Sequence, residues 1–241
     1  MIIKTENPLL LVRAVELVSE LVQEARFRIS KTGINVTAID PANVAMISFS
    51  ISKDAFSRFE VDNEILGINL EDLKKILKRA GVKSSLELKR EDNKLSIEIN
   101  DRIKRNFTLN LIDIKKEDKD LPNLEFTARV EMNSVDLIDA IDDCIVVSDA
   151  CSFVVKENKF IIEAKSLNSA RAEFSGDEAK INAENCKARY SLEYLQKFIK
   201  GSKFCEKTIL NFSNDHPLRM DLKIESLDLS FILAPRVETD D

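Results

Sequence analysis

Four segments of the chain carry apolar residues at helical spacing, three or four positions apart. They cover residues 11–22, 70–77, 137–141 and 192–199. Asn69 and Ser134 stand where an N-cap residue is expected before the second and third segments. Gly81 and Gly201 follow the second and fourth, where a left-handed C-cap glycine is common. The pattern predicts four helices.

Between these segments the period changes to two. Apolar and polar residues alternate over 28–30, 34–39, 86–88, 95–99, 107–111 and 227–231, as expected for half-buried antiparallel strands. Polar turn residues separate them at 91–94, 157–159 and 213–215. We therefore expect an α+β fold in which two helices lie on one face of antiparallel sheet in each domain, and each domain looks internally doubled.

The chain repeats itself at long range. A shift of 126 positions places residues 14–38 on 140–164, and a shift of 122 places 69–78 on 191–200, with apolar residues meeting apolar residues. A period this long indicates duplicated domains rather than a solenoid. We predict an N-terminal domain over 1–112, a linker over 113–125 and a C-terminal domain over 126–241, and pseudo-symmetric chains of this kind are suited to building rings.

The predicted linker is charged, loses all periodicity and ends near Pro122, which fits neither helix nor central strand. Its isolated apolar residues, Ile114, Leu121 and Leu124, are expected to touch the surface beneath.

Composition excludes several classes of protein. The 241 residues are 44% apolar and 32% charged, and no apolar run approaches the roughly 20 residues of a membrane span. The net charge of −6 argues against nucleic-acid binding over the whole surface, so any such contact must be confined to stripes. No signal peptide is visible, and the four cysteines lack CxxC spacing, which indicates reduced residues inside the cell rather than disulfides or a metal site.

The sequence shows no catalytic constellation. The single histidine, His216, precedes Pro217 in a predicted turn, where a loop role is favoured over a general base. Five scattered glycines form no phosphate-binding loop. We therefore expect no enzyme activity, no cofactor and no metal.

Charge is arranged in stripes. The second and fourth helices carry basic residues, whereas the third carries acids; the basic set is Lys74, Lys75, Lys78, Arg79, Lys197, Lys200 and Lys203, and the acidic set is Asp136, Asp139, Asp142 and Asp143. Ordinary solvated helix faces explain each stripe taken alone. The duplication favours a common surface instead, because equivalent helices of a pseudo-symmetric ring line the same side.

Several motifs resemble one known family. They are GINVTAIDPANVAM (33–46), LKKILK (73–78), LID (111–113), DLP (120–122), VSD (147–149) and LAPRVE (233–238). Together they resemble the DNA sliding clamp called proliferating cell nuclear antigen, most closely its archaeal members, in order from Ile2 to Glu238. The resemblance implies a closed ring of three two-domain chains around duplex DNA, with helices lining the hole and sheet outside.

The resemblance also implies sites. The DNA-facing candidates are Arg13, Lys74, Lys75, Lys78, Gln196, Lys197 and Lys200. A pocket for partner peptides is carried over to Ile39, Val44, Met46, Leu121, Phe126, Pro217, Ile232, Ala234 and Pro235, although plain strand core is the alternative for the first three. Many relatives have an apolar residue at Lys119 and an aromatic one at Ile232, so the rim of this pocket departs from the family pattern.

Ring closure implies edge strands that pair between chains, and residues 105–111 and 169–174 occupy the matching positions. Asp139 and Asp143 match acidic interface positions, while Arg79, Lys83 and Arg105 match basic ones, with plain surface helix as the alternative. One chain that carries both sets is expected to form a homotrimer, and a heterotrimer of different chains, which the family also contains, is the alternative.

The implied partners are double-stranded DNA, a DNA polymerase, a clamp loader, a flap endonuclease and a ligase, the proteins binding through short PIP-box peptides. No membrane contact is expected, and the implied location is the cytoplasm beside the archaeal nucleoid, or the nucleus in a eukaryote. Two alternatives stay open: a nuclease or polymerase subunit with carboxylate-bound magnesium, and a monomeric module that keeps the fold without closing a ring.

Overall fold

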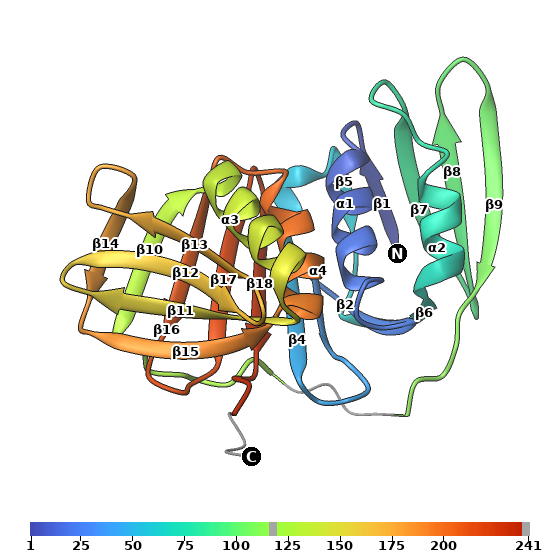
Figure 1. The fold of residues 1–241 in the computed structure, drawn as a ribbon. Coiled ribbons are helices and arrows are strands. Elements are labelled where there is room, and N and C mark those ends of the chain that lie inside the picture. The colour runs from blue at the N-terminus through green and yellow to red at the C-terminus, as the bar shows by residue number, and fades with distance from the viewer. Residues whose placement is uncertain (116–119, 238–241) are drawn as a thin grey trace. The chain divides into compact units, whose positions relative to one another are not determined.

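A computed structural model describes residues 1–115 and 120–237 (Figure 1). Lys119, at the rim of the predicted pocket, and Glu238, at the end of the last matching motif, lie outside the described residues. The chain divides into two compact units. Unit 1 comprises Met1–Pro41, Ile47–Leu121 and Glu225–Leu229, and unit 2 comprises Ala42–Met46, Pro122–Ile224 and the chain from Ser230 onward. The passage from Leu121 to Pro122 lies inside the segment predicted to be the linker.

Unit 1 contains two helices and two sets of antiparallel strands. One sheet has the order β5 (Arg58–Glu60), β1 (Ile2–Thr5), β7 (Ser85–Glu91), β8 (Lys94–Asn100) and β9 (Lys104–Asn110). The other strands pair in the order β3 (Gly33–Ile39), β2 (Glu24–Ser30) and β6 (Glu64–Asn69). The helices are α1 (Leu9–Val18) and α2 (Leu70–Leu77), with a short 3-10 helix η1 (Lys53–Ala55).

Unit 2 repeats this plan. One sheet has the order β13 (Ser169–Phe174), β12 (Lys159–Lys165), β11 (Ala150–Lys156) and β15 (Cys186–Ser191). A second set pairs as β14 (Ala179–Ala183), β10 (Ala128–Asn133), β16 (Lys207–Phe212) and β17 (Leu218–Ile224). The helices are α3 (Ser134–Val147) and α4 (Leu192–Ser202), and the remaining strands β4 (Ala45–Ser52) and β18 (Leu227–Leu233) each give residues to both units.

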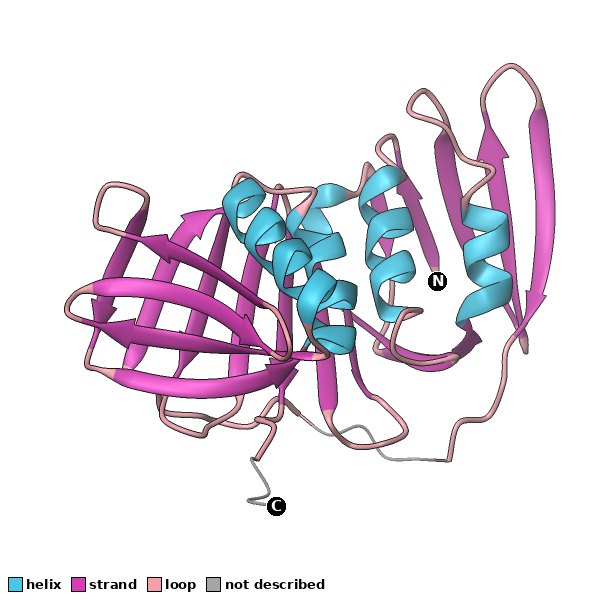
Figure 2. Cartoon of the chain, viewed as in Figure 1, coloured by secondary structure: helices cyan, strands magenta, loops and turns pink. Residues whose placement is uncertain are grey.

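The duplication predicted from the sequence is confirmed by the elements. A shift of 126 positions carries β2 and β3 onto β11 and β12, and a shift of 122 carries the first residue of α2 onto the first residue of α4. Within each unit the two helices contact one another. Figure 2 draws the helices in cyan. The α+β architecture expected from the two hydrophobic periods is therefore present in both halves.

Apolar side chains hold each helix against its unit. Val15 and Val18 of α1 are fully buried, as are Leu195 and Phe198 of α4. The Phe198 ring stacks on Phe231 with 4.5 Å between centroids. Burying a side chain of this size contributes about 1.5–3 kcal/mol, so these apolar faces fix each helix on its unit. The opposite faces of the helices are left for polar residues. None of the helices in the described ranges is long and apolar enough to cross a membrane.

One predicted cap is confirmed and three are wrong. Asn69 caps α2, because its Oδ1 accepts a hydrogen bond of 3.0 Å from the amide of Asp72. The N-cap of α3 is Asn133 rather than Ser134, whose hydroxyl lies 2.9 Å from that of Thr208 in the core.

Neither Gly81 nor Gly201 adopts a left-handed C-cap, since α2 ends in the right-handed residue Lys78 and α4 continues through Gly201. After α2, tight turns of the chain satisfy the last carbonyl groups. The amides of Arg79 and Ala80 bond to the carbonyls three residues earlier, at 2.9 Å each. A left-handed residue is therefore not needed.

Candidate functional site

The basic residues of α2 lie on its solvent side but are not isolated charges. Lys75 and Lys78 are exposed, whereas Leu73 and Leu77 on the opposite side are buried. The Nζ of Lys75 lies 3.1 Å from Glu71, and this hydrogen bond raises the pKa of Lys75, so its ammonium group stays charged. The Nζ of Lys78 lies 3.5 Å from Glu16 on α1. These acids temper the positive potential of the face.

The other DNA-facing candidates have similar surroundings. Half-buried Lys74 donates a hydrogen bond of 3.1 Å to the hydroxyl of Ser19, and Arg13 is half-buried on α1. On α4, Gln196 and Lys200 are exposed. The Nζ of Lys197 lies 3.1 Å from Glu193 and 4.9 Å from the centre of the Tyr194 ring.

These compensating acids were not expected from the sequence. The spacing of Glu71 and Glu193, four residues before Lys75 and Lys197, was the available signal. The contact of Lys78 with Glu16 on α1 had none, because it joins distant parts of the chain.

The predicted peptide pocket consists largely of half-buried apolar residues. In unit 2 the main chain joins two of its distant members, because the amide of Ala234 donates a hydrogen bond of 2.9 Å to the carbonyl of Val44. Ile232 is only 6% exposed, so it offers little surface. The other members are all half-buried; Val44, Met46, Phe126, Pro217, Ala234 and Pro235 belong to unit 2, and Ile39 and Leu121 to unit 1.

His216 is more tightly packed than a surface turn would require. Its ring meets the Phe126 ring edge to face, with 5.8 Å between centroids. Its Nε2 is buried without a hydrogen-bond partner among the described residues. Its carbonyl accepts a hydrogen bond of 2.8 Å from the hydroxyl of Tyr190, whose pKa is raised by burial. The loop of 213–217 is therefore fixed beside one member of the predicted pocket.

Both strands predicted to close a ring lie at the edges of sheets. In the described part of the chain, β9 pairs only with β8 and β13 pairs only with β12. An edge strand leaves a row of main-chain donors and acceptors unpaired, which is the template for pairing with another chain. The two strands belong to different units, as a head-to-tail contact requires.

The charged interface candidates divide into two groups. Asp139 and Asp143 are exposed on α3 and form no ion pair with another described residue, and Arg79 and Lys83 are exposed after α2. Arg105 differs, because its guanidinium is hydrogen-bonded to Asp101 of the same chain and its Nε is buried. A preceding acid four positions away was the sequence signal for this internal pair.

The remaining reactive groups form no centre. No cluster of three or more metal-ligating side chains occurs within residues 1–115 and 120–237. The four cysteines are free thiols. A hydrogen bond with Cys144, together with burial, raises the pKa of Cys151, so this thiol stays protonated and unreactive.

Two family models match the chain in sequence. The N-terminal domain of proliferating cell nuclear antigen matches residues 1–120, and its C-terminal domain matches residues 120–237. The chain is 36% identical over 233 residues to the DNA polymerase sliding clamp of Pyrococcus furiosus, covering 93% of each chain. It is 38% identical over 228 residues to that of Thermococcus fumicolans, covering 91% of this chain and 92% of the relative.

Solved structures agree with these relatives. Proliferating cellular nuclear antigen of Entamoeba histolytica superimposes with a TM-score of 0.91 at 27% identity, covering 98% of each chain. The A. fulgidus antigen bound to the C-terminal region of FEN-1 also gives a TM-score of 0.91, at 26% identity and 99% coverage of each chain. Since both family domains match in order and together span almost the whole sequence, the chain belongs to the proliferating cell nuclear antigen family.

Proposed function

We propose that this protein is a DNA polymerase sliding clamp, a ring that encircles duplex DNA and tethers polymerase and other replication and repair proteins to it. The observation that carries this proposal is the consecutive match of both clamp domains to residues 1–120 and 120–237. A clamp acts by topology rather than by bond making, so the protein is not an enzyme.

Three chains close the ring head to tail in this proposal. The edge strand β9 of one chain pairs with β13 of the next, and the acids Asp139 and Asp143 face basic partners across the contact. A heterologous contact of this kind forms a closed ring when the rotation per chain fits. Because Arg105 is bound to Asp101 of its own chain, Arg79 and Lys83 are the better candidates for those basic partners.

The partners act through DNA and through peptides. Duplex DNA is held without regard to sequence by weak, mobile contacts between lysines and phosphates, which permits sliding. The ion pairs that Lys75 and Lys78 make with nearby acids support this role, since partly neutralised lysines centre the duplex without arresting it. Polymerase, clamp loader, flap endonuclease and ligase bind through PIP-box peptides, and a FEN-1 segment is bound to the A. fulgidus relative.

The function is tested by assembly and by polymerase extension. The purified 27.3 kDa chain is expected to have the native mass of a trimer and to lengthen the products of an archaeal DNA polymerase on a primed circular template. A lone chain that leaves product length unchanged would indicate a monomeric module. Metal-dependent cleavage of the template would indicate a nuclease. Since the chain acts on the chromosome, we place it in the archaeal cytoplasm, at the nucleoid.

The peptide pocket is tested separately by calorimetry. A peptide of the form Gln-x-x-aliphatic-x-x-aromatic-aromatic is expected to bind with micromolar affinity, about −8 kcal/mol. Met46→Ala is expected to weaken binding, because it removes half-buried apolar surface. Lys4→Ala is the control, since Lys4 lies on β1 and pairs with Glu6 at 3.0 Å. Equal affinity for all three proteins would reject the pocket while leaving the ring proposal intact.

A further inference from the structure

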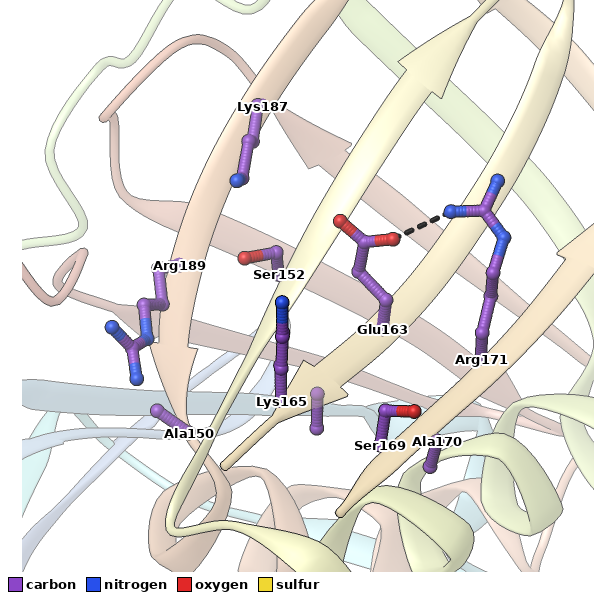
Figure 3. A pocket seen from close by; sticks show the side chains of 10 residues that line it. Ala150, Ser152, Glu163, Lys165, Ser169, Ala170, Arg171, Lys187 and Arg189 are labelled. Carbon is purple, nitrogen blue, oxygen red and sulfur yellow. Dashed lines mark hydrogen bonds and ion pairs between the residues drawn. The ribbon is translucent and has the colours of Figure 1, made fainter. Parts of the chain in front are cut away.

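The sheet β13-β12-β11-β15 has one buried face and one polar face. Phe153, Phe160 and Tyr190 point from one face into the core, where the Phe153 ring packs edge to face on Phe212 of β16 at 5.9 Å. The residues that alternate with them form a hollow of about 440 Å³ on the other face. Figure 3 shows this hollow, and none of its residues belongs to the predicted DNA-facing or peptide-binding sets. Three of them, Ser169, Ala170 and Arg171, lie on β13, the strand proposed to pair with the next chain, so the hollow borders the proposed subunit contact.

A single row of side chains crosses this hollow from strand to strand. Arg189 of β15 lies opposite Ser152 of β11, Ser152 lies opposite Glu163 of β12, and Glu163 lies opposite Arg171 of β13. Lys187 lies two residues from Arg189 on β15, and Lys165 lies two residues from Glu163 on β12, so both extend the same face. The hollow thus gathers four basic side chains around one acid.

The acid Glu163 already has a cationic partner within the sheet. Arg171 binds Glu163 at 2.6 Å and Glu173 at 3.1 Å, so its charge is compensated within the sheet. Lys165 and Lys187 are exposed, and neither forms an ion pair with another described residue. A local excess of positive charge therefore remains on a protein whose net charge is −6. Such an excess attracts anions at short range.

An apolar side chain adjoins these cations. Leu167 stands at the turn between β12 and β13, two residues from Lys165 and from Ser169, and it is 101% exposed. A leucine this exposed beside a charged hollow is suited to an interface, because burying it removes apolar surface from water.

We propose that this hollow is a second docking surface, which binds an extended acidic segment of a partner protein. Alternate residues of an extended peptide project to the same side about 6–7 Å apart, which is the spacing of Lys187 and Arg189 along β15. Carboxylates of the segment meet the exposed Lys165 and Lys187, and an apolar residue of the segment covers Leu167.

The composition of the hollow favours a peptide over nucleic acid. Grooves for single-stranded nucleic acid combine cations with aromatic side chains on which bases stack. The residues that line this hollow include no aromatic side chain. Glu163, in the centre of the hollow, is paired with Arg171 and offers carboxylate oxygens to which peptide N–H groups donate.

Fluorescence anisotropy on the assembled trimer tests this surface. The probe is a labelled peptide Glu-Leu-Glu-Leu-Glu-Asp-Glu, with its Lys-for-acid counterpart and a ten-nucleotide oligo-dT as comparisons. Lys165→Glu with Lys187→Glu is expected to weaken peptide binding about tenfold or more at low salt. The matched control is Lys180→Glu with Lys223→Glu, which makes the same charge change at exposed positions on β14 and β17.

The outcomes separate the alternatives. Retained binding in the control and in Met46→Ala, with loss in the hollow variant, supports the proposal. An equal loss of peptide binding in the hollow variant and in the control would indicate non-specific charge attraction and would overturn the proposal. Tighter, hollow-dependent binding of oligo-dT would replace the peptide with nucleic acid. If the monomer binds the peptide and the trimer does not, the hollow is occupied by a second copy of the chain. If neither binds the peptide, the docking surface is rejected.

Discussion

At the scale of single residues, Gly67 shows how closely two parts of unit 1 approach. Its carbonyl accepts a hydrogen bond of 3.0 Å from the amide of Ile112, where the chain enters the predicted linker. A Cβ at this position would lie 2.1 Å from the carbonyl oxygen of Ile112 and 3.2 Å from a side-chain carbon of Ile114. Ile114 touches the surface beneath it, as its isolated apolar character predicts.

Gly67→Ala is therefore expected to lower the free energy of unfolding by about 1–3 kcal/mol, because the main chain at 112 must move to admit the methyl group. Chemical denaturation measures this change. Gly176→Ala is the matched control, since nothing lies within 4 Å of a Cβ there. Identical denaturation midpoints for the two variants would show that the chain at 112 yields without cost.

At the scale of elements, α2 carries both the attraction for DNA and its restraint in the proposed clamp. Glu71 and Asp72 stand in its first turn, where acids also favour the helix dipole, and both lie near Lys75, at 3.1 and 3.8 Å. The two acids and the basic residues of this face therefore act in opposite directions on a passing phosphate.

Opposite substitutions on α2 are expected to have opposite effects on DNA. Lys75→Gln with Lys78→Gln is expected to shorten retention on linear duplex DNA. It is also expected to lower the magnitude of the slope of log K for DNA binding against log salt concentration, by about 0.9 for each phosphate that a lysine no longer neutralises. Glu71→Gln with Asp72→Asn lengthens retention, because the same lysines then face DNA without competing carboxylates. Surface-immobilised DNA at several salt concentrations measures both, and unchanged slopes would place α2 away from DNA.

At the scale of the whole molecule, closure of the proposed ring combines main-chain pairing with charge. The edge strands β9 and β13 supply the pairing, and exposed Asp143 on α3 supplies an acid without an internal partner among the described residues. Individual exposed ion pairs contribute only about 0.2–1 kcal/mol, so charge adjusts the stability of the ring rather than creating it.

Asp143→Lys is accordingly expected to shift the trimer toward monomer at low protein concentration, and adding Lys83→Asp is expected to restore part of it. Sedimentation velocity at low and high salt measures the distribution. High salt should reduce the difference between the variants, because exposed charges are screened. If the trimer is lost and neither salt nor the second substitution changes that loss, the substitution has damaged strand pairing and the effect is not one of charge.

The sequence alone determined the features that depend on local periodicity. Helical spacing at 70–77 and 192–199 and alternation at 34–39 identified the elements, and the shifts of 126 and 122 positions identified the duplication. The motifs also carried the family, and with it the clamp fold. These features are readable because side chains repeat every 3.6 residues in a helix and every two in a strand, whatever the rest of the chain does.

Only the tertiary structure decided which distant residues meet. The pairing of Lys78 with Glu16 and the burial of Ile232 leave no mark on the local pattern. The predicted cap at Gly81 failed because turns satisfy the last carbonyl groups of α2, and the one at Gly201 failed because α4 continues to Ser202. The hollow of Figure 3 depends on the register of four strands, which sets Arg189, Ser152, Glu163 and Arg171 in one row. Register joins residues across strands, and packing of the whole sheet fixes it.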